Sequence, residues 1–127
     1  MAKKIPVTEI LICDDSFETR MLLKTILTKE GFTVTEATDG IMAQELAAAR
    51  QPDLIIMDLV MPRQDGLTTL KKLKSDPETQ DIPVIIISGK SAVTGVLEEN
   101  KKLISAILEK PFHVKDIKQK VAEILNV

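Results

Sequence analysis

The feature that most restricts how this chain can fold is a series of short, uninterrupted apolar segments. Four of them are continuous, whereas a fifth, at residues 32–37, alternates apolar residues with threonine and glutamate. A continuous apolar run is typical of a strand that is covered on both faces, and alternation is typical of an edge strand. The four continuous segments are residues 10–13, 54–57, 84–87 and 106–108.

Amphipathic patterns at helical spacing separate these segments. We expect helices over residues 20–29, ended by Gly31, over residues 41–50, capped by Asp39, and over a stretch that follows Asp65 and Gly66. Two more are expected, over residues 93–103, where Gly95 weakens the pattern, and near the C-terminus. The apolar residues of the predicted helices are Leu22, Leu23, Ile26 and Leu27, then Leu67, Leu70 and Leu73, then Val93, Val96, Leu97 and Leu103, and finally Val114, Ile117, Val121, Ile124 and Leu125.

Strand and helix therefore alternate five times along the chain. Parallel strands with connections of this length require right-handed crossovers, with helices on both faces of the sheet. The prediction is an α/β fold with an open, doubly wound, five-stranded parallel sheet. Since 127 residues suit one domain and no repeat or linker interrupts them, we expect a single domain over residues 1–127, with a core at about 8–126.

Composition excludes several classes of partner. The net charge is −2, from 17 basic and 19 acidic residues, so nothing favours direct binding to nucleic acid. The single cysteine, Cys13, cannot form an internal disulfide, which fits a reducing compartment. No segment has the apolar length of a signal peptide or a membrane span. We therefore expect a cytoplasmic protein with no membrane partner.

Charged and polar residues close four of the predicted strands. Asp14 and Asp15 follow the first, Asp58 closes the third, Ser88 the fourth and Lys110 the fifth. The carboxyl ends of such strands form the ligand-binding edge of a doubly wound sheet. Crowded carboxylates repel one another, and Mg²⁺ relieves this repulsion because it prefers oxygen ligands and leaves positions open for phosphate. Taken alone, Asp14 and Asp15 could equally be a helix cap. The polar and charged residues at the other strand ends favour a ligand-binding site instead.

Four fragments carry a resemblance to a known family. They are D-D at 14–15, D-L-V-M-P-R-Q-D-G at 58–66, S-G at 88–89 and K-P-F at 110–112. In this order and at these strand ends they resemble a response-regulator receiver domain, the phosphoacceptor module of two-component signalling. The resemblance covers nearly the whole chain and implies the flavodoxin-like (βα)5 fold.

The resemblance also implies a metal site. By it, Asp58 is the residue that is phosphorylated. Asp14 and Asp15 hold Mg²⁺, and Asp58 and the backbone carbonyl of Val60 complete the protein ligands. Mg²⁺ is the only cofactor that we expect.

The remaining implied roles concern phosphoryl transfer. Ser88 bonds a phosphoryl oxygen, Lys110 pairs with Asp58 or its phosphate, and the Lys110–Pro111 bond is typically cis. The phosphoryl donor is a phosphohistidine on a histidine kinase or phosphotransfer protein, and a downstream protein target reads the result. The chain would then be no enzyme in the ordinary sense, because it catalyses only its own phosphorylation and dephosphorylation.

One position departs from the family pattern in a way that bears on signalling. Many relatives carry Tyr or Phe at the position of Ile107, so an aromatic switch is absent here, and we expect coupling through Ser88 and local backbone movement.

Phe17 and Met21 lie one helical turn apart, away from the expected core face. We interpret them as an exposed contact for the helices of a kinase or phosphotransfer domain.

Several alternatives stay open. The chain is either a stand-alone regulator of the chemotaxis-regulator kind or a receiver excised from a longer regulator or histidine kinase. A small aspartyl-phosphate phosphatase of the haloacid dehalogenase type needs a second Asp two residues after its nucleophile, and Asp14 and Asp15 are adjacent. A flavodoxin-like cofactor binder needs a loop that attracts phosphate, which D-D-S-F-E repels. A receiver that only binds proteins is disfavoured because all five site residues are present.

Overall fold

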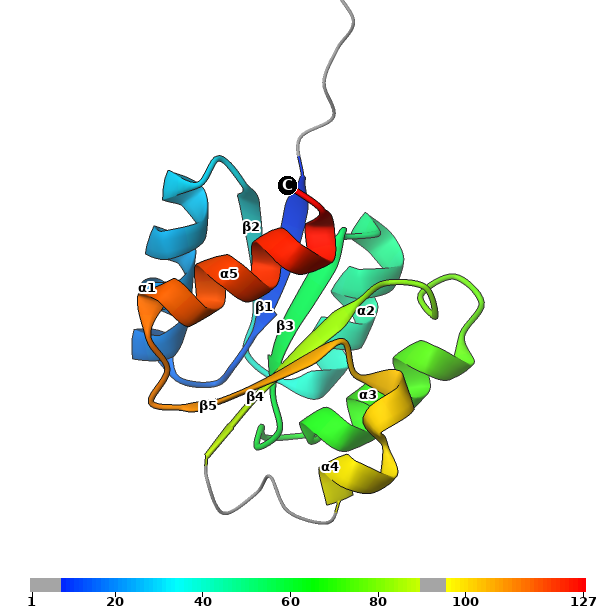
Figure 1. Cartoon of the computed structure of the whole chain (residues 1–127). Helices are drawn as coiled ribbons and strands as arrows, with labels where there is room; N and C mark the ends of the chain where they lie inside the picture. Colours follow the sequence, from blue (N-terminus) through cyan, green and yellow to red (C-terminus); the bar gives the residue numbers. More distant parts are fainter. Residues whose placement is uncertain (1–7, 90–95) are drawn as a thin grey trace, which may run out of the picture.

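The chain folds around one five-stranded parallel sheet (Figure 1), in a computed structural model that describes residues 8–89 and 96–127. The strand order is β2-β1-β3-β4-β5, so the chain adds strands on one side of β1 and then on the other. This confirms the predicted doubly wound α/β fold. The strands are β1 (Glu9–Cys13), β2 (Thr33–Ala37), β3 (Leu54–Asp58), β4 (Val84–Gly89) and β5 (Ala106–Lys110).

Burial of the strands follows their place in the sheet. The apolar runs of β1, β3 and β4 are buried throughout, as continuous runs predict. The alternating strand β2 lies at one edge, as predicted. The expectation for β5 was wrong in part. This strand forms the other edge, and only Leu108 in it is buried, because no further strand covers its outer side.

The helices begin where the predicted caps stand. Asp39 and Asp65 accept hydrogen bonds from the backbone N–H groups of Met42 and Thr68, each the third residue of its helix. The first helix begins three residues earlier than predicted, because the Ser16 hydroxyl caps it. The longer helices are α1 (Phe17–Lys29), α2 (Gly40–Arg50), α3 (Gly66–Ser75) and α5 (Val114–Leu125).

The helix predicted over residues 93–103 is not continuous in the part of the chain that the structure describes. It consists of α4 (Val96–Glu99) and a short 3₁₀ helix, η2 (Lys101–Leu103), on either side of Asn100. Asparagine favours turns over helix interiors, which explains the break. Val93 and Gly95, which were part of this prediction, lie outside the described residues.

Two apolar layers enclose the sheet. Helices α1 and α5 cover one face, where Leu23, Ile26, Ile117 and Val121 belong to one buried apolar cluster with the strand residues beneath them. Helices α2 and α3, with η2, cover the other face. Two residues that we expected in the core lie outside it. Leu22 is 43% exposed and Val114 is 45% exposed, because each stands at the margin of its helix's buried face.

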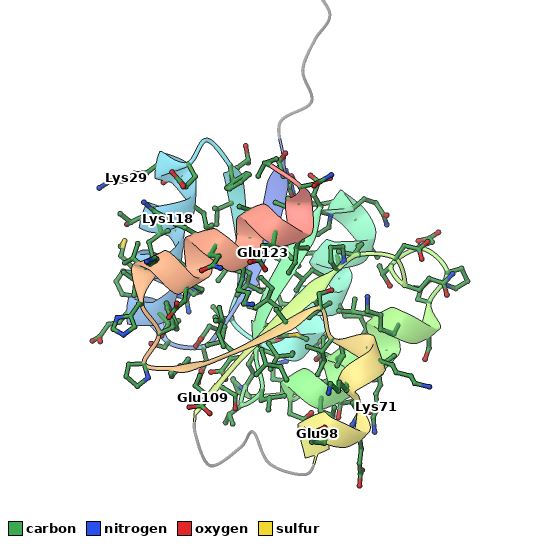
Figure 2. The ribbon with its side chains drawn as sticks, in the orientation of Figure 1. Lys29, Lys71, Glu98, Glu109, Lys118 and Glu123 are labelled. Atoms are coloured by element: carbon green, nitrogen blue, oxygen red, sulfur yellow. The ribbon has the colours of Figure 1, made fainter. Side chains whose placement is uncertain are left out.

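Charged side chains cover the outer surfaces of the helices. Figure 2 shows Lys29 on α1, Lys118 and Glu123 on α5, and Lys71 on α3 extending away from the sheet, and all four are exposed. Among the described residues, every helix is too short or too polar to cross a bilayer.

Candidate functional site

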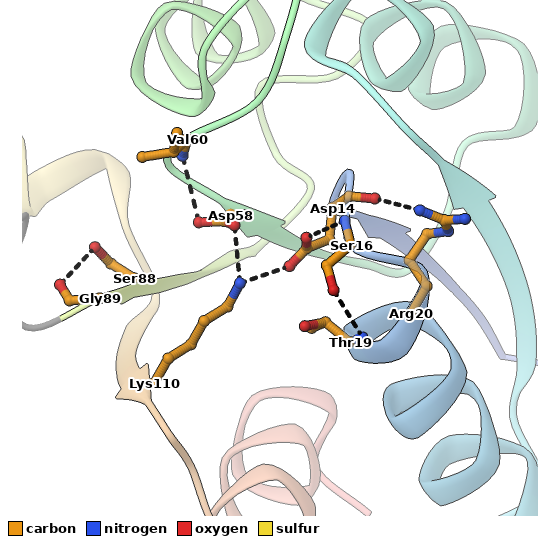
Figure 3. A network of polar contacts seen from close by, with 9 residues as sticks. All are labelled: Asp14, Ser16, Thr19, Arg20, Asp58, Val60, Ser88, Gly89 and Lys110. Carbon is orange, nitrogen blue, oxygen red and sulfur yellow. Dashed lines mark hydrogen bonds and ion pairs between the residues drawn. The ribbon is translucent and has the colours of Figure 1, made fainter.

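The site lies where the carboxyl ends of three strands meet. Asp14 follows β1, Asp58 is the last residue of β3, and Lys110 is the last residue of β5. The Lys110 Nζ lies 3.0 Å from an Asp14 carboxylate oxygen and 2.9 Å from an Asp58 carboxylate oxygen (Figure 3). One ammonium group therefore joins two carboxylates that are 44 residues apart in the sequence.

A third carboxylate completes the cluster. Each of Asp14, Asp15 and Asp58 offers a carboxylate oxygen, and these oxygens lie within 4.8 Å of one another. Asp14 and Asp58 are buried, whereas Asp15 is exposed. The cluster is therefore reached from solvent on the side of Asp15. Its oxygen donors are of the type that Mg²⁺ and Ca²⁺ prefer over softer ligands.

Burial and charge shift the pKa values of two of these groups. Burial raises the pKa of the Asp14 carboxyl, and the negative charge of Asp58 adds to this, although hydrogen bonds from Ser16 and Lys110 act in the opposite direction. Burial by itself would lower the pKa of the Lys110 ammonium. Its hydrogen bonds and charge interactions with Asp58 and Asp14 more than offset this, so the pKa of Lys110 is raised. The lysine therefore stays charged at neutral pH.

The turn from β1 to α1 is held by three contacts to Asp14. The Asp14 N–H donates to the Ala37 carbonyl at 3.1 Å, and an Asp14 carboxylate oxygen accepts from the Ser16 N–H at 2.8 Å. The Arg20 Nη1 donates to the Asp14 carbonyl oxygen at 2.8 Å. Ser16 in turn accepts from the Thr19 N–H, so the start of α1 and the position of Asp14 are fixed together.

The loop after Asp58 folds back on the strand end. The Val60 N–H donates to an Asp58 carboxylate oxygen at 3.3 Å, and the Val60 side chain is 70% exposed. Gly66 begins α3 and donates its N–H to the Leu59 carbonyl at 2.7 Å. A side chain at Gly66 would collide with the Asp58 carbonyl, so a glycine is required where the loop closes.

Ser88 lies at the same end of the sheet but is turned aside. It is buried, and it follows Ile87, which pairs with Asp58 across β3 and β4. Its hydroxyl donates to the Gly89 carbonyl at 3.1 Å. Among the described residues, the Ser88 hydroxyl therefore makes no hydrogen bond to the carboxylates or to Lys110. The structure brings together the other predicted side chains.

A family model decides what kind of site this is. The model of the response regulator receiver domain matches residues 10–122. The chain belongs to the response regulator receiver family. This sets aside the phosphatase and the flavodoxin-like cofactor binder as identities, and it makes the receiver a signalling module and not a classical enzyme. The Lys110–Pro111 bond is cis, as the resemblance implied.

The curated relatives of this receiver differ in length. Chemotaxis protein CheY of Bacillus subtilis is 35% identical over 119 residues, which are 92% of this chain and 97% of that protein. Sporulation initiation phosphotransferase F of the same organism is 32% identical over 118 residues, 92% and 93% of the two chains. The transcriptional regulator RpaA of Synechocystis is 35% identical over 117 residues, and the receiver spans only 48% of its length.

Solved structures share the fold. The receiver domain of a sensor histidine kinase from Pseudomonas aeruginosa, which has a magnesium ion coordinated in its active-site cleft, matches with a TM-score of 0.86 at 22% identity. The match covers 96% of this receiver and all of that chain. A sensor protein from Polaromonas matches with a TM-score of 0.85 at 29% identity, over 95% and 98% of the two chains.

Two features of the site were not foreseen from the sequence. Lys110 was expected to pair with Asp58, but it also bonds Asp14. Arg20 was given no role at the site from the sequence, yet its side chain is 12% exposed and reaches the Asp14 carbonyl. The signal that was available is its spacing of four residues from the cap Ser16, which turns Arg20 toward the strand end.

Proposed function

We propose that Asp58 accepts a phosphoryl group from a phosphohistidine on a histidine kinase or phosphotransfer protein, in a reaction that requires Mg²⁺. Membership of the receiver family makes the chain a phosphoacceptor signalling module. The observation that carries the proposal for these residues is the Lys110 ammonium, which lies within 3.0 Å of both Asp14 and Asp58 beside the exposed Asp15.

The metal site uses the carboxylates of Asp14, Asp15 and Asp58 and the backbone carbonyl of Val60. Three clustered carboxylates, two of them buried, are unfavourable without a cation, and all of the donors are hard oxygens. The magnesium in the cleft of the Pseudomonas receiver supports this choice of ion. When bound, Mg²⁺ neutralises charge on the phosphoryl oxygens.

Side chains of this protein carry out the remaining parts of the phosphoryl transfer. An Asp58 carboxylate oxygen attacks the phosphorus, the phosphorus–nitrogen bond of the donor breaks, and the electron pair leaves with the histidine. Lys110 stabilises the negative charge that spreads over the phosphoryl oxygens. The Ser88 hydroxyl leaves the Gly89 carbonyl and donates to a phosphoryl oxygen of the product.

Titration calorimetry with Mg²⁺ tests the metal site. Wild-type protein should bind one ion, and Asp15→Asn should bind it about tenfold more weakly or not at all, since a ligand charge is lost. Asp15 is exposed, so this change leaves the core intact. The matched control is Asp81→Asn, an exposed aspartate just before β4, at the opposite end of the sheet. Wild-type protein without measurable binding at millimolar Mg²⁺ would contradict the proposal.

The surface that receives the phosphoryl donor lies beside the site on α1. Phe17, Met21 and Leu22 are exposed on this helix, at 64%, 49% and 43%. A cleft of about 420 Å³ separates α1 from the loop after β5 and reaches Lys110. Its lining residues are Glu18, Thr19, Leu22, Lys110, Pro111 and Phe112. An apolar surface next to a charged site fits a helix of a kinase or phosphotransfer protein that presents its histidine.

Phe17→Ala tests this surface. Transfer from a phosphorylated partner should slow, because exposed aromatic contacts carry much of the affinity of such interfaces. Phosphorylation by acetyl phosphate, which needs no docking helix, is the control and should keep its rate. An unchanged rate of transfer from the partner would show that the exposure of Phe17 is incidental and that it does not bind the donor.

Water should remove the phosphoryl group slowly. Val60 is exposed beside Asp58 and cannot orient a water molecule by hydrogen bonding. Val60→Asn should therefore shorten the lifetime of phosphorylated Asp58, measured as loss of radioactive label. A longer lifetime in this variant would contradict the role given to Val60.

The output is a protein contact that depends on phosphorylation. This chain spans two of the relatives almost completely and RpaA over 48% of its length, so its relatives include both short receivers and longer regulators. Capture of binding proteins with and without beryllofluoride, an analogue of the phosphoryl group, tests the contact. A binding protein that prefers the activated form is the expected result.

A further inference from the structure

Arg20 reaches the backbone of the site from α1. Its Nη1 donates to the Asp14 carbonyl oxygen at 2.8 Å (Figure 3), and its Nε donates to a Glu36 carboxylate oxygen on β2 at 3.1 Å. The Phe17 ring lies over its guanidinium carbon at 5.9 Å, and the Arg20 side chain is 12% exposed. An arginine on the surface of a helix is usually solvated, so this degree of burial and bonding indicates a defined role.

The carbonyl that Arg20 holds belongs to the peptide unit between Asp14 and Asp15. A peptide unit is planar, so a fixed carbonyl oxygen fixes the orientation of the unit and the direction in which the next side chain leaves it. The Asp14 N–H is held as well, by the Ala37 carbonyl at 3.1 Å. Both sides of the Asp14 backbone are therefore anchored, and Arg20 provides the anchor on the side of Asp15.

Glu36 explains how the positively charged Arg20 guanidinium can lie so close to the proposed magnesium site. The Arg20 charge is paired with the Glu36 carboxylate, which also lies 3.5 Å from the Lys24 ammonium. This pairing limits the repulsion between the guanidinium and an incoming Mg²⁺. The planar guanidinium donates in two fixed directions at once, to a carbonyl and to a carboxylate, which a lysine ammonium does not reproduce.

We propose that Arg20 is a positioning residue for the magnesium site, which it serves by orienting the peptide unit between its first two carboxylates. This inference rests on the proposed function, because it requires that the cluster binds Mg²⁺. Groups that hold metal ligands in place from outside the ligand set typically change metal affinity by about 10- to 100-fold when they are removed.

Calorimetric titration of the unphosphorylated protein with Mg²⁺ tests the inference. Arg20→Gln should weaken Mg²⁺ binding about tenfold. The matched control is Arg50→Gln, which removes a two-bond ion pair to Glu9, at 2.7 and 2.9 Å, at the other end of β1. This control should bind Mg²⁺ as wild type does. Unfolding in urea without metal is measured in parallel, since a merely structural arginine would lower stability and leave the affinity of the folded protein unchanged.

Arg20→Lys keeps the positive charge and most of the aliphatic side chain. It therefore tests the positioning role if the Arg20→Gln variant does not fold. It should bind Mg²⁺ several-fold more weakly than wild type. If wild type binds Mg²⁺ and the foldable Arg20 variants bind within about twofold of it, the positioning role is wrong and the metal site stands. If wild type itself does not bind, the proposed function fails, and this inference fails with it.

Discussion

At the scale of single residues, the site is a compromise between burial and charge. Asp14 is 1% exposed, and its charge is balanced by Lys110 and by the Ser16 N–H, yet burial still raises its pKa. Even with Lys110 beside it, a carboxylate in this position is unfavourable for the folded state unless further positive charge, such as a metal ion, joins it. The buried charge of Asp14 therefore lowers the stability of the metal-free protein, which fits the proposed role of Asp14 as a magnesium ligand.

Asp14→Asn should reveal how much stability the buried charge of Asp14 costs the folded protein. In EDTA at neutral pH, the variant should be more stable than wild type by about 1 kcal/mol, because the amide keeps the shape and removes the buried charge. A raised carboxyl pKa means that the folded state binds the proton more tightly, so the unfavourable contribution is present above that pKa and disappears as pH falls toward the ordinary value of 3.8. The advantage of the variant should therefore shrink on acidification.

Urea unfolding of both proteins over a series of pH values provides the measurement. The same variant should lose Mg²⁺ binding, which separates a metal ligand from an ordinary buried acid. A variant that is less stable than wild type at neutral pH would show that the Asp14 contacts to Lys110 and Ser16 outweigh the burial of its charge.

At the scale of elements, the strand ends and helix starts place the chemistry. Helix α3 begins against the backbone of Asp58, because Gly66 has no side chain to hold them apart. Gly66→Ala should force α3 and the end of β3 apart. We expect a loss of about 2 kcal/mol in the free energy of unfolding and slower phosphorylation by acetyl phosphate.

The control for this change is Gly89→Ala at the end of β4, where a new methyl group meets no atom of residues 8–89 or 96–127 within 4 Å. Its free energy of unfolding should stay close to that of wild type. Equal stability of the Gly66 variant would mean that α3 accommodates a side chain at its first residue, and that its contact with Asp58 does not constrain the site.

The elements were largely predictable because each carries a local signal. Apolar runs mark the strands, and Asp39 and Asp65 mark the starts of α2 and α3 by hydrogen bonds within a few residues. The break at Asn100 also has a local cause that the prediction overlooked, because asparagine favours turns over helix interiors. The exposure of Leu22 was not predictable, because it depends on how far that face of α1 lies from a neighbouring element. The same holds for the contacts of Arg20, which joins α1 to β2 across the fold.

At the scale of the whole molecule, the site and the two apolar layers share the same strands. Ile107 on β5 packs against the layer under α2 and α3, together with Leu103 and Ile104. It pairs with Ile86 on β4, two residues before Ser88. Receivers with an aromatic residue at this position have a bulky ring to reorient, whereas Ile107 is a packing residue of the sheet.

Ile107→Ala should therefore lower stability and leave signalling intact. Removing a partly buried isoleucine side chain should cost about 2 kcal/mol of unfolding free energy. The ratio of partner affinities with and without beryllofluoride should not change, if Ser88 and the backbone carry the coupling. Ile104→Ala, in the same apolar layer but outside the sheet, is the matched control. A ratio that falls in the Ile107 variant alone would assign the switch to this side chain.

We propose above all that the paired carboxylates and Lys110 make Asp58 a phosphoryl acceptor. The most direct test of this proposal is to treat the protein with acetyl phosphate and Mg²⁺, reduce it with borohydride, which converts an aspartyl phosphate to homoserine, and read the peptides by tandem mass spectrometry. We expect homoserine at position 58, and none when Mg²⁺ is left out. Label at another aspartate, or uptake by Asp58→Asn equal to that of wild type, would contradict it.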